Sequence, residues 1–147
     1  MTPQFYLPQI EEFHVGFEFE SKTDTDTWIK ETFATNFTHH NSKDISRGIS
    51  QKAVRVKYLD RQDIESVLGV KQLNNHETEL NFQFGNKKYG HYEIDYDTEE
   101  YKLIIEEWYQ PQMVGHDTGK RNCNTLFNGT ILNKSELKTL MIQLNIK

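Results

Sequence analysis

The amino-acid sequence predicts an α+β fold: a mostly antiparallel sheet of about five to seven strands with two short helices packed on one face. Three observations support this prediction. Several segments alternate apolar with polar residues, two segments carry complete helix-capping signals, and the chain is rich in the aromatic residues that favour half-buried strands. A length of 147 residues fits one core, so residues 1–147 are predicted to form a single domain.

Strands are predicted first in the N-terminal half. In FHVGFEFE, the residues on one side are all apolar and those on the other side are mostly polar, which is typical of a strand; the apolar residues are Phe13, Val15, Phe17 and Phe19. The polar run SKTDTDT then predicts a turn, and WIKETF (28–33) predicts either a returning strand or a short irregular element. AVRVKYL (53–59) predicts a further strand.

The C-terminal half predicts a meander. Three alternating segments between residues 79 and 108 are separated by the turn-forming connectors GNKK and DTEE, which indicates three antiparallel strands. A short strand, LFNGTI (126–131), is expected after them. Residues 36–52 and 109–125 show neither helical nor strand periodicity, so both segments are predicted to be long loops.

The first predicted helix lies in LDRQDIESVLG. Asp60 is a suitable N-cap with Asp63 at the third helical position, and Leu59 and Ile64 occupy the two positions of a hydrophobic staple. Gly69 is placed to end the helix in a left-handed conformation. The segment therefore carries a start signal, a stop signal and an apolar contact.

The second predicted helix closes the chain in LNKSELKTLMIQLNIK. Asn133 is the expected N-cap, Glu136 forms a capping-box-like pair with it, and Leu132 is expected to contact Leu137. Its apolar stripe has helical spacing and consists of Leu137, Leu140, Met141 and Leu144. Burying four such side chains is worth roughly 6–12 kcal/mol, so the stripe is predicted to cover the core of this protein.

Composition excludes several classes of function. The 17 Lys and Arg against 22 Asp and Glu give a net charge of −5, which disfavours a nucleic-acid partner. No segment approaches the ~20 apolar residues of a membrane span, so no membrane partner is expected. One cysteine cannot form an internal disulfide, which favours a reducing cytoplasm, that of the host cell if the protein is encoded by a phage.

Candidate site residues lie in the two predicted loops. A Gly-, Lys- and Arg-containing segment in residues 109–125 has the chemistry to hold a phosphate or another ligand; its candidate residues are His116, Asp117, Lys120 and Arg121. The earlier loop is a candidate interaction segment through His39, His40, Asp44 and Arg47. No catalytic residue, metal ligand or cofactor is predicted, because no nucleophile, zinc or dinucleotide motif is present.

One face of each of two predicted strands carries a histidine with two acidic residues. These are His91, Glu93 and Asp95 in HYEIDY, and His14, Glu18 and Glu20 in HVGFEFE. If the two strands were neighbours, the side chains would converge on a divalent-metal site. The solvated face of an antiparallel sheet has the same pattern, and that interpretation is preferred.

Three segments together resemble a known group of proteins: IEEFHVGFEFE, VRVKYLDRQDIES and LFNGTILNKSELKTLMIQLNI. They are similar to small proteins carried by bacteriophages of Bacteroidetes and by mobile elements in those hosts. The resemblance covers about a third of the residues and spans nearly the full length. It implies no activity and no catalytic residue, because none is attached to that group.

Three functional hypotheses follow. The preferred one is a non-enzymatic accessory protein of a phage or mobile element that binds a host or phage protein through the two loops and an aromatic-acidic sheet face. The first alternative is a small ligand- or phosphate-binding protein or a hydrolase that uses residues 109–125. The second alternative is a structural homo-oligomer, such as a homodimer, or a virion component.

Overall fold

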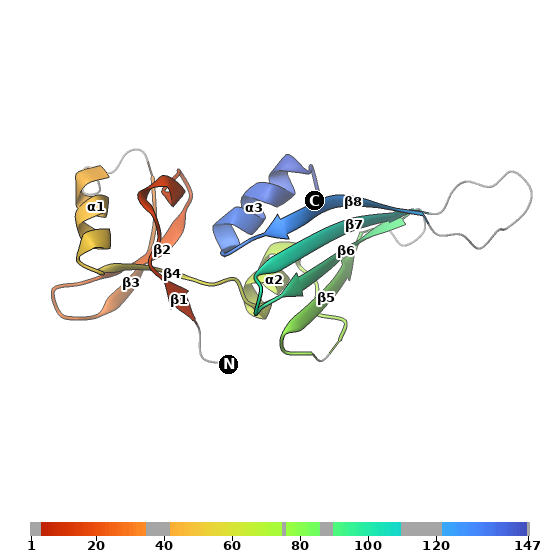
Figure 1. Ribbon diagram of the computed structural model, residues 1–147, viewed down its shortest axis with the longest axis horizontal. Helices are drawn as coiled ribbons and strands as arrows, with labels where there is room; N and C mark the ends of the chain where they lie inside the picture. Colours follow the sequence, from red (N-terminus) through yellow and green to blue (C-terminus); the bar gives the residue numbers. More distant parts are fainter. Residues whose placement is uncertain (1–3, 35–41, 75, 86–89, 110–121, 147) are drawn as a thin grey trace, which may run out of the picture. The chain divides into compact units, whose positions relative to one another are not determined.

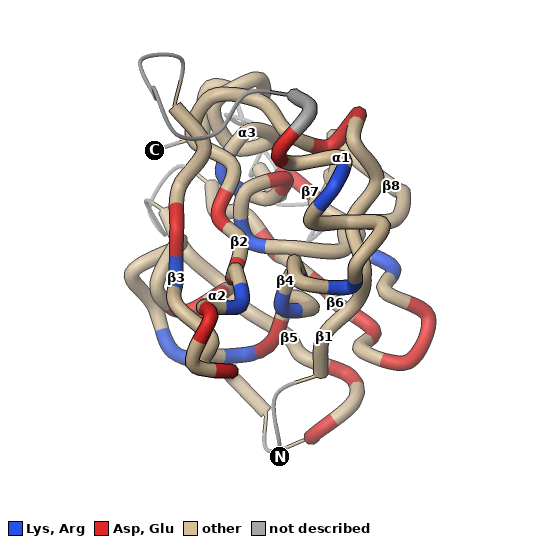
Figure 2. Tube along the Cα trace, turned by 90° about the vertical axis from the view of Figure 1, so that its left-hand side faces the viewer, with Lys and Arg blue, Asp and Glu red and all other residues tan. Residues whose placement is uncertain are grey.

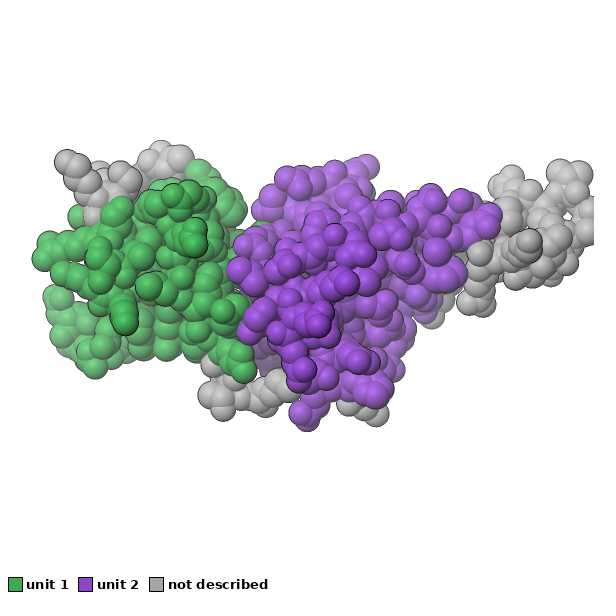
Figure 3. Space-filling view, viewed as in Figure 1, with its two compact units in different colours: residues 1–58, 133–135 green, residues 59–132, 136–147 purple. Residues whose placement is uncertain are grey.

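A computed structural model describes residues 4–34, 42–74, 76–85, 90–109 and 122–146. The contacts within the chain divide it into two compact units, coloured separately in Figure 3. Unit 1 comprises Met1–Tyr58 with Asn133–Ser135, and unit 2 comprises Leu59–Leu132 with Glu136–Lys147. Compact units defined by contacts need not unfold separately, so a single domain over residues 1–147 stays a prediction.

Unit 1 contains a four-stranded antiparallel sheet with the strand order β1-β4-β2-β3 (Figure 1). Its elements are β1 (Phe5–Tyr6), the short 3-10 helix η1 (Ile10–Glu12), β2 (Glu18–Lys22), β3 (Trp28–Thr32), α1 (Ser42–Ser50) and β4 (Val54–Lys57). The buried cluster of this unit is small and consists of Phe17, Phe19, Ile45, Val54 and Val56.

The strand predicted from Phe13 begins only at Glu18. Gly16 has a φ of +90°, which an L-residue rarely adopts, and the chain turns there so that Val15 is 59% exposed. The ring centroid of Phe13 lies 5.0 Å from that of Phe17 and 5.1 Å from that of Phe19, and both contacts are edge-on. The alternating aromatics therefore build a cluster around a turn, and the pattern alone does not distinguish that cluster from a continuous strand.

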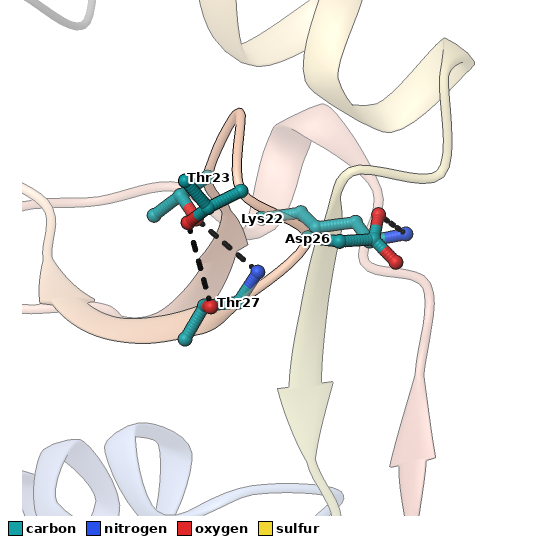
Figure 4. Close-up of polar contacts among 5 residues, drawn as sticks. Lys22, Thr23, Asp26 and Thr27 are labelled. Carbon is teal, nitrogen blue, oxygen red and sulfur yellow. Dashed lines mark hydrogen bonds and ion pairs between the residues drawn. The ribbon is translucent and has the colours of Figure 1, made fainter.

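The turn between β2 and β3 confirms the prediction from SKTDTDT, and WIKETF forms β3. The Thr23 N–H donates to Thr27 O at 2.8 Å, and the Thr27 N–H donates to Thr23 Oγ1 at 3.2 Å. Lys22 Nζ lies 2.5 Å from Asp26 Oδ1, and Figure 4 shows this ion pair beside the bond from the Thr27 N–H to the Thr23 hydroxyl. The Thr23 hydroxyl thus satisfies one backbone N–H at the tip of this hairpin.

Residues 42–50 form α1, so the prediction of one loop over residues 36–52 is wrong for that part. Only Ile45 and Ile49 are apolar in this segment, too few for a recognisable helical period. They lie one turn apart, and both pack in the cluster of unit 1. A Cβ atom at Gly48 would come within 2.7 Å of Val54 Cγ2, so α1 packs closely against β4 at this glycine.

Unit 2 contains a second four-stranded antiparallel sheet, a meander in the order β5-β6-β7-β8 (Figure 1). Its elements are α2 (Arg61–Leu68), β5 (Glu79–Phe84), β6 (Gly90–Asp97), β7 (Lys102–Tyr109), β8 (Asn122–Thr130) and α3 (Lys134–Gln143), of which the last begins within the residues assigned to unit 1. The three predicted meander strands are confirmed. β8 is longer than LFNGTI, and its first residues fall in the segment predicted to be a loop.

The core of unit 2 joins one face of this sheet to α2 and α3. Fourteen buried residues form it: Leu59, Ile64, Leu80, Phe82, Phe84, Ile94, Tyr96, Leu103, Ile105, Ile131, Leu137, Leu140, Met141 and Ile146. The Tyr96 hydroxyl donates to Ile131 O at 3.1 Å, and burial raises the pKa of this phenol. Both predicted helices therefore cover the apolar face of a sheet, as expected.

The capping predictions for α2 are confirmed in detail. The side chain of Asp60 accepts from the Asp63 N–H at 3.0 Å, and Gly69 ends the helix with a φ of +70°. At α3, Glu136 Oε2 accepts from the Leu132 N–H at 2.7 Å, which fixes the residues before the helix. The neighbouring Asn133 is buried, and its side-chain amide donates to the Tyr6 hydroxyl at 2.9 Å.

The α+β class is confirmed, whereas the predicted single sheet with two helices is wrong in its details. The described residues form two sheets of four strands and three α-helices. β4 pairs with β1 and β2, although the helix that directly follows it packs on the other sheet. Period-2 alternation identifies a strand but not its neighbours, which is why the number of sheets could not be read from the pattern.

Candidate functional site

The described residues include only two of the eight candidates from the predicted loops. Asp44 and Arg47 lie on α1 and are exposed, so they belong to a helix and not to the interaction loop that was predicted. The other six lie outside the described residues: His39, His40, His116, Asp117, Lys120 and Arg121. The predicted ligand-binding segment therefore stays a prediction.

The sheet of unit 2 has a second face, opposite its buried cluster. Strand register places the side chains of this outer face in four rows across the sheet. The rows are Glu79, Asp97, Lys102 and Thr130; then Asn81, Asp95, Ile104 and Asn128; then Gln83, Glu93, Glu106 and Thr125; and finally His91, Trp108 and Cys123. The residues of α2 and α3 that contact the sheet belong to the cluster on the other face.

Negative charge dominates these described rows. Five carboxylates face a single cation, Lys102; the carboxylates are those of Glu79, Glu93, Asp95, Asp97 and Glu106. Within the described part of the chain, none of the five forms an ion pair with Lys or Arg. Figure 2 colours the acidic and basic residues along the Cα trace. The strand register given above determines which of them lie on the outer face.

Two of the acidic pairs lie directly opposite each other on neighbouring strands. Glu79 faces Asp97 across β5 and β6, and Glu93 faces Glu106 across β6 and β7. Like charges in directly opposite positions destabilise a sheet by roughly 0.2–1 kcal/mol per pair. The folded protein therefore retains an unfavourable charge arrangement on a face that no described helix covers.

Asp97 also shapes the turn between β6 and β7. Its carboxylate accepts the N–H groups of Glu100 at 2.9 Å and of Glu99 at 2.8 Å, and these bonds hold its pKa below the usual range. The nearby charge of Lys102 acts in the same direction. This carboxylate is therefore ionised at neutral pH and adds a fixed negative charge to the edge of the outer face.

A shallow hollow of about 460 Å³ lies at the acidic end of the outer face. Ile104 supplies an apolar surface within it, and Asp95 and Asn128 lie directly opposite Ile104 on the two neighbouring strands. The polar lining residues include Asn74, Asn81, Asp95, Asp97, Glu100 and Lys102. An apolar patch next to carboxylates matches a lysine or arginine side chain, whose stem is apolar and whose head is cationic.

The opposite end of the outer face carries an aromatic pair. The rings of His91 and Trp108 are stacked, with centroids 6.4 Å apart and planes 6° from parallel. His91 Nε2 lies 3.2 Å from Glu93 Oε1, which orients the imidazole. Trp108 Nε1 is buried and has no hydrogen-bond partner among the described residues. Aromatic side chains are enriched in protein interfaces, and the faces of their rings attract cations.

The outer face of the sheet in unit 1 is built differently. Arg55 on β4 lies with its guanidinium 3.7 Å from the ring centre of Phe5 and 4.1 Å from that of Trp28. Its Nε donates to Glu20 Oε2 at 2.8 Å, and its second terminal nitrogen lies 2.7 Å from the same oxygen. The four residues come from all four strands, so we call them the Arg55 clamp. Its charges neutralise each other.

The charge difference extends to the whole units. Unit 1 contains eight Asp and Glu and eight Lys and Arg, whereas unit 2 contains fourteen acidic against nine basic residues. The net charge of −5 therefore belongs entirely to unit 2. Its acidic outer face is part of a larger excess of negative charge, which attracts cations and repels anions.

The two strands of the hypothetical metal site are not neighbours in one sheet. His91, Glu93 and Asp95 do share one face of β6, as the alternation predicted, but Glu18 and Glu20 lie on β2 in the other sheet. The described residues contain no group of three or more His, Cys, Asp or Glu that could hold a metal ion. In the same part of the chain, no helix is long and apolar enough to cross a membrane.

The sequence pattern predicted only three residues of the outer face. The alternation in HYEIDY placed His91, Glu93 and Asp95 together, but Glu79 and Glu106 were not assigned to the same surface. The missing information was the register between strands, because it decides which acidic residues become neighbours. The tight turn signals GNKK and DTEE did contain that information in principle, since a short hairpin connection limits the registers.

Comparisons with protein-family models, with curated proteins and with solved structures find no match to this chain.

Proposed function

We propose that this protein acts by binding another protein, and that the acidic outer face of the sheet in unit 2 binds a basic segment of that partner. The observation that carries the proposal is that two pairs of carboxylates occupy directly opposite positions on neighbouring strands, Glu79 with Asp97 and Glu93 with Glu106. A partner that supplies Lys or Arg side chains between these carboxylates converts a repulsive arrangement into an attractive one.

The geometry of the face supports a peptide-like or protein partner over a small molecule. The hollow around Ile104 is shallow and open, whereas small-molecule sites enclose most of their ligand. The aromatic pair of His91 and Trp108 lies at the opposite end of the same face. A partner that uses both features has to extend along the strands, as a protein segment does.

The other functional hypotheses remain predictions. The resemblance to proteins of Bacteroidetes phages and mobile elements makes a host protein or a phage protein the expected partner, and this stays a prediction. The alternative of a ligand-binding or hydrolytic site within residues 109–125 also stays a prediction, because residues 110–121 lie outside those described.

The test uses a lysine-rich peptide as a defined basic probe and an acidic peptide of equal length as its counterpart. Titration of the full-length protein is followed by amide chemical shifts. We expect the basic peptide to shift amides of β5, β6 and β7 at low ionic strength, with the effect decreasing as salt is added. Shifts confined to other elements would contradict the proposed site.

A matched pair of double variants distinguishes peptide binding at the outer face from a general response to the net charge of the protein. Glu93→Gln with Glu106→Gln removes two charges from the outer face. Glu11→Gln with Glu77→Gln removes two exposed charges elsewhere. The face variant should bind the basic peptide about three- to tenfold more weakly than the control variant does. Equal losses in both variants would show that the peptide responds only to total charge, and the proposal would be rejected.

A further inference from the structure

The two sheets have four outer strands, and three of them carry features that block the addition of another strand. β1 is only two residues long, and β3 contains the charged residues Lys30 and Glu31. The edge of β5 is occupied, because the Leu73 N–H donates to Asn81 O at 2.8 Å and Asn74 Nδ2 donates to Glu79 O at 3.1 Å. Short length, charge and coverage are the usual protections of a sheet edge.

The fourth outer strand, β8, lacks these protections. It is nine residues long, and its sequence NCNTLFNGT contains neither a charged residue nor a proline. It pairs with β7 on one side, and within the described residues no strand or loop pairs with its other side. One irregularity lies in its register with β7, between Ile105 and Glu106, and most of its side chains are exposed.

From these observations we propose that β8 is the seam of a homodimer, in which the β8 strands of two copies pair antiparallel and join their second sheets. In an antiparallel pair, backbone groups alternate between the two sides of a strand, so β8 presents a row of donors and acceptors away from β7. Two copies related by a twofold axis satisfy these groups on both chains at once.

The side chains of β8 favour a second copy over a foreign strand. Three asparagines and two threonines provide uncharged groups that can hydrogen-bond across the seam without repulsion. A charged strand of either sign would find no opposite charge on β8 itself, and pairing would hold its charge against uncharged side chains. An uncharged strand therefore has its best electrostatic match in its own sequence.

The seam is separate from the acidic outer face. It uses the free edge of the sheet, so the rows that contain Glu93 and Glu106 remain open in the dimer. Pairing would place the outer faces of two copies next to each other in one continuous sheet. The dimer is tested by the mass of the protein in solution, and the acidic face is tested by peptide binding. The failure of either proposal therefore leaves the other intact.

The first test measures the mass of the full chain in solution over a range of concentrations, by sedimentation equilibrium. We expect a monomer–dimer equilibrium in the wild type. Asn124→Lys places a charge on the edge of β8, on the face away from the acidic rows, and should raise the dimer dissociation constant about tenfold or more. Gln143→Lys, which adds the same charge at an exposed position of α3, should leave the constant unchanged.

The second test locates the seam by cross-linking. Cys123 is replaced by serine, and single cysteines are then placed in turn along β8. An antiparallel seam brings only the residue at the twofold axis opposite its own copy, so disulfide-linked dimers should form at one position or at two neighbouring ones. Circular dichroism of each variant verifies that the fold is retained before cross-linking is scored.

Three results would overturn the proposal. The first is a monomer at every concentration that can be reached. The second is a dimer equally stable in wild type and Asn124→Lys, with no cross-link along β8, which would place the seam elsewhere. The third is cross-linking at many β8 positions without preference, which indicates random collision. A dimer weakened by Asn124→Lys alone, with a localised cross-link, establishes the seam.

Discussion

The two sheets have the same number of strands and the same antiparallel pairing, yet different interactions stabilise them. Unit 2 buries fourteen residues between its sheet and two helices, whereas the buried cluster of unit 1 has five. Unit 1 adds edge-on phenylalanine contacts on one face of its sheet and the Arg55 clamp on the other. Unit 2 thus combines a large apolar core with an outer face whose acidic charges are not neutralised. Unit 1 combines a small core with an outer face on which the charges of Glu20 and Arg55 neutralise each other.

This difference suggests a division of roles between the outer faces. In unit 1, the polar face contributes to stability, because Glu20, Arg55 and the two rings interact with one another. In unit 2, the polar face opposes stability through like-charge neighbours, and the core has to offset that cost. Unfavourable surface arrangements are retained mainly where binding uses them. Four predictions test this contrast, beginning with the largest expected effect.

The largest effect is expected from the core of unit 2. Leu140→Asp would bury a carboxylate in a position that is 8% exposed, and should destabilise the protein by about 3–5 kcal/mol. Ile142→Asp introduces the same residue on the same helix at a position that is 78% exposed, and should change stability by less than about 0.5 kcal/mol. Urea unfolding followed by circular dichroism measures both. A stable Leu140→Asp variant that lost only binding would show that α3 is a docking helix instead.

The Arg55 clamp should contribute an intermediate amount. Arg55→Lys keeps the charge but removes the planar group between the two rings, and should destabilise the protein by about 1–2 kcal/mol. Arg47→Lys is the matched control, because Arg47 is exposed on α1. Thermal unfolding of the two variants is compared with wild type. Equal stability of all three proteins would mean that the charge of Arg55, and not its stacking, is what matters.

The same Glu→Gln substitution should change the stability of the protein in opposite directions on the two outer faces. Glu20→Gln weakens the ion pair with Arg55 and should destabilise the protein by about 1 kcal/mol. Glu106→Gln relieves the repulsion from Glu93 and should stabilise it by about 0.2–1 kcal/mol. Denaturant unfolding at low ionic strength measures both changes, and added salt should reduce the second one. A loss of stability in both variants would remove the contrast between the faces.

The smallest effect concerns the turn between β6 and β7. The backbone N–H groups of Glu100 and Glu99 lower the pKa of Asp97 in the folded state, so its ionised form stabilises the turn. That contribution is present above the ordinary aspartate pKa of about 3.9 and is lost as the pH falls through the lower folded pKa. The carboxyl carbon shift of Asp97 measures its titration. A midpoint at or above the ordinary value would contradict the arrangement of this turn.

Local signals in the sequence predicted some elements well and others poorly. α2 was predictable because Asp60, Ile64 and Gly69 specify its start, its buried face and its end within eleven residues. α1 was not, because two isoleucines in a polar segment give no period, and their packing against β4 supplies the missing reason. The start of β8 was missed because an edge strand exposed on both faces needs no alternation.

The sequence by itself determined the α+β class, the capped helices, the turn residues and the acidic balance, because each depends on residues close together in the chain. The tertiary structure alone decided that the strands form two sheets, that five carboxylates gather on one face, and that β8 is left at an edge. These properties depend on register and strand order between distant segments, which local periodicity does not encode.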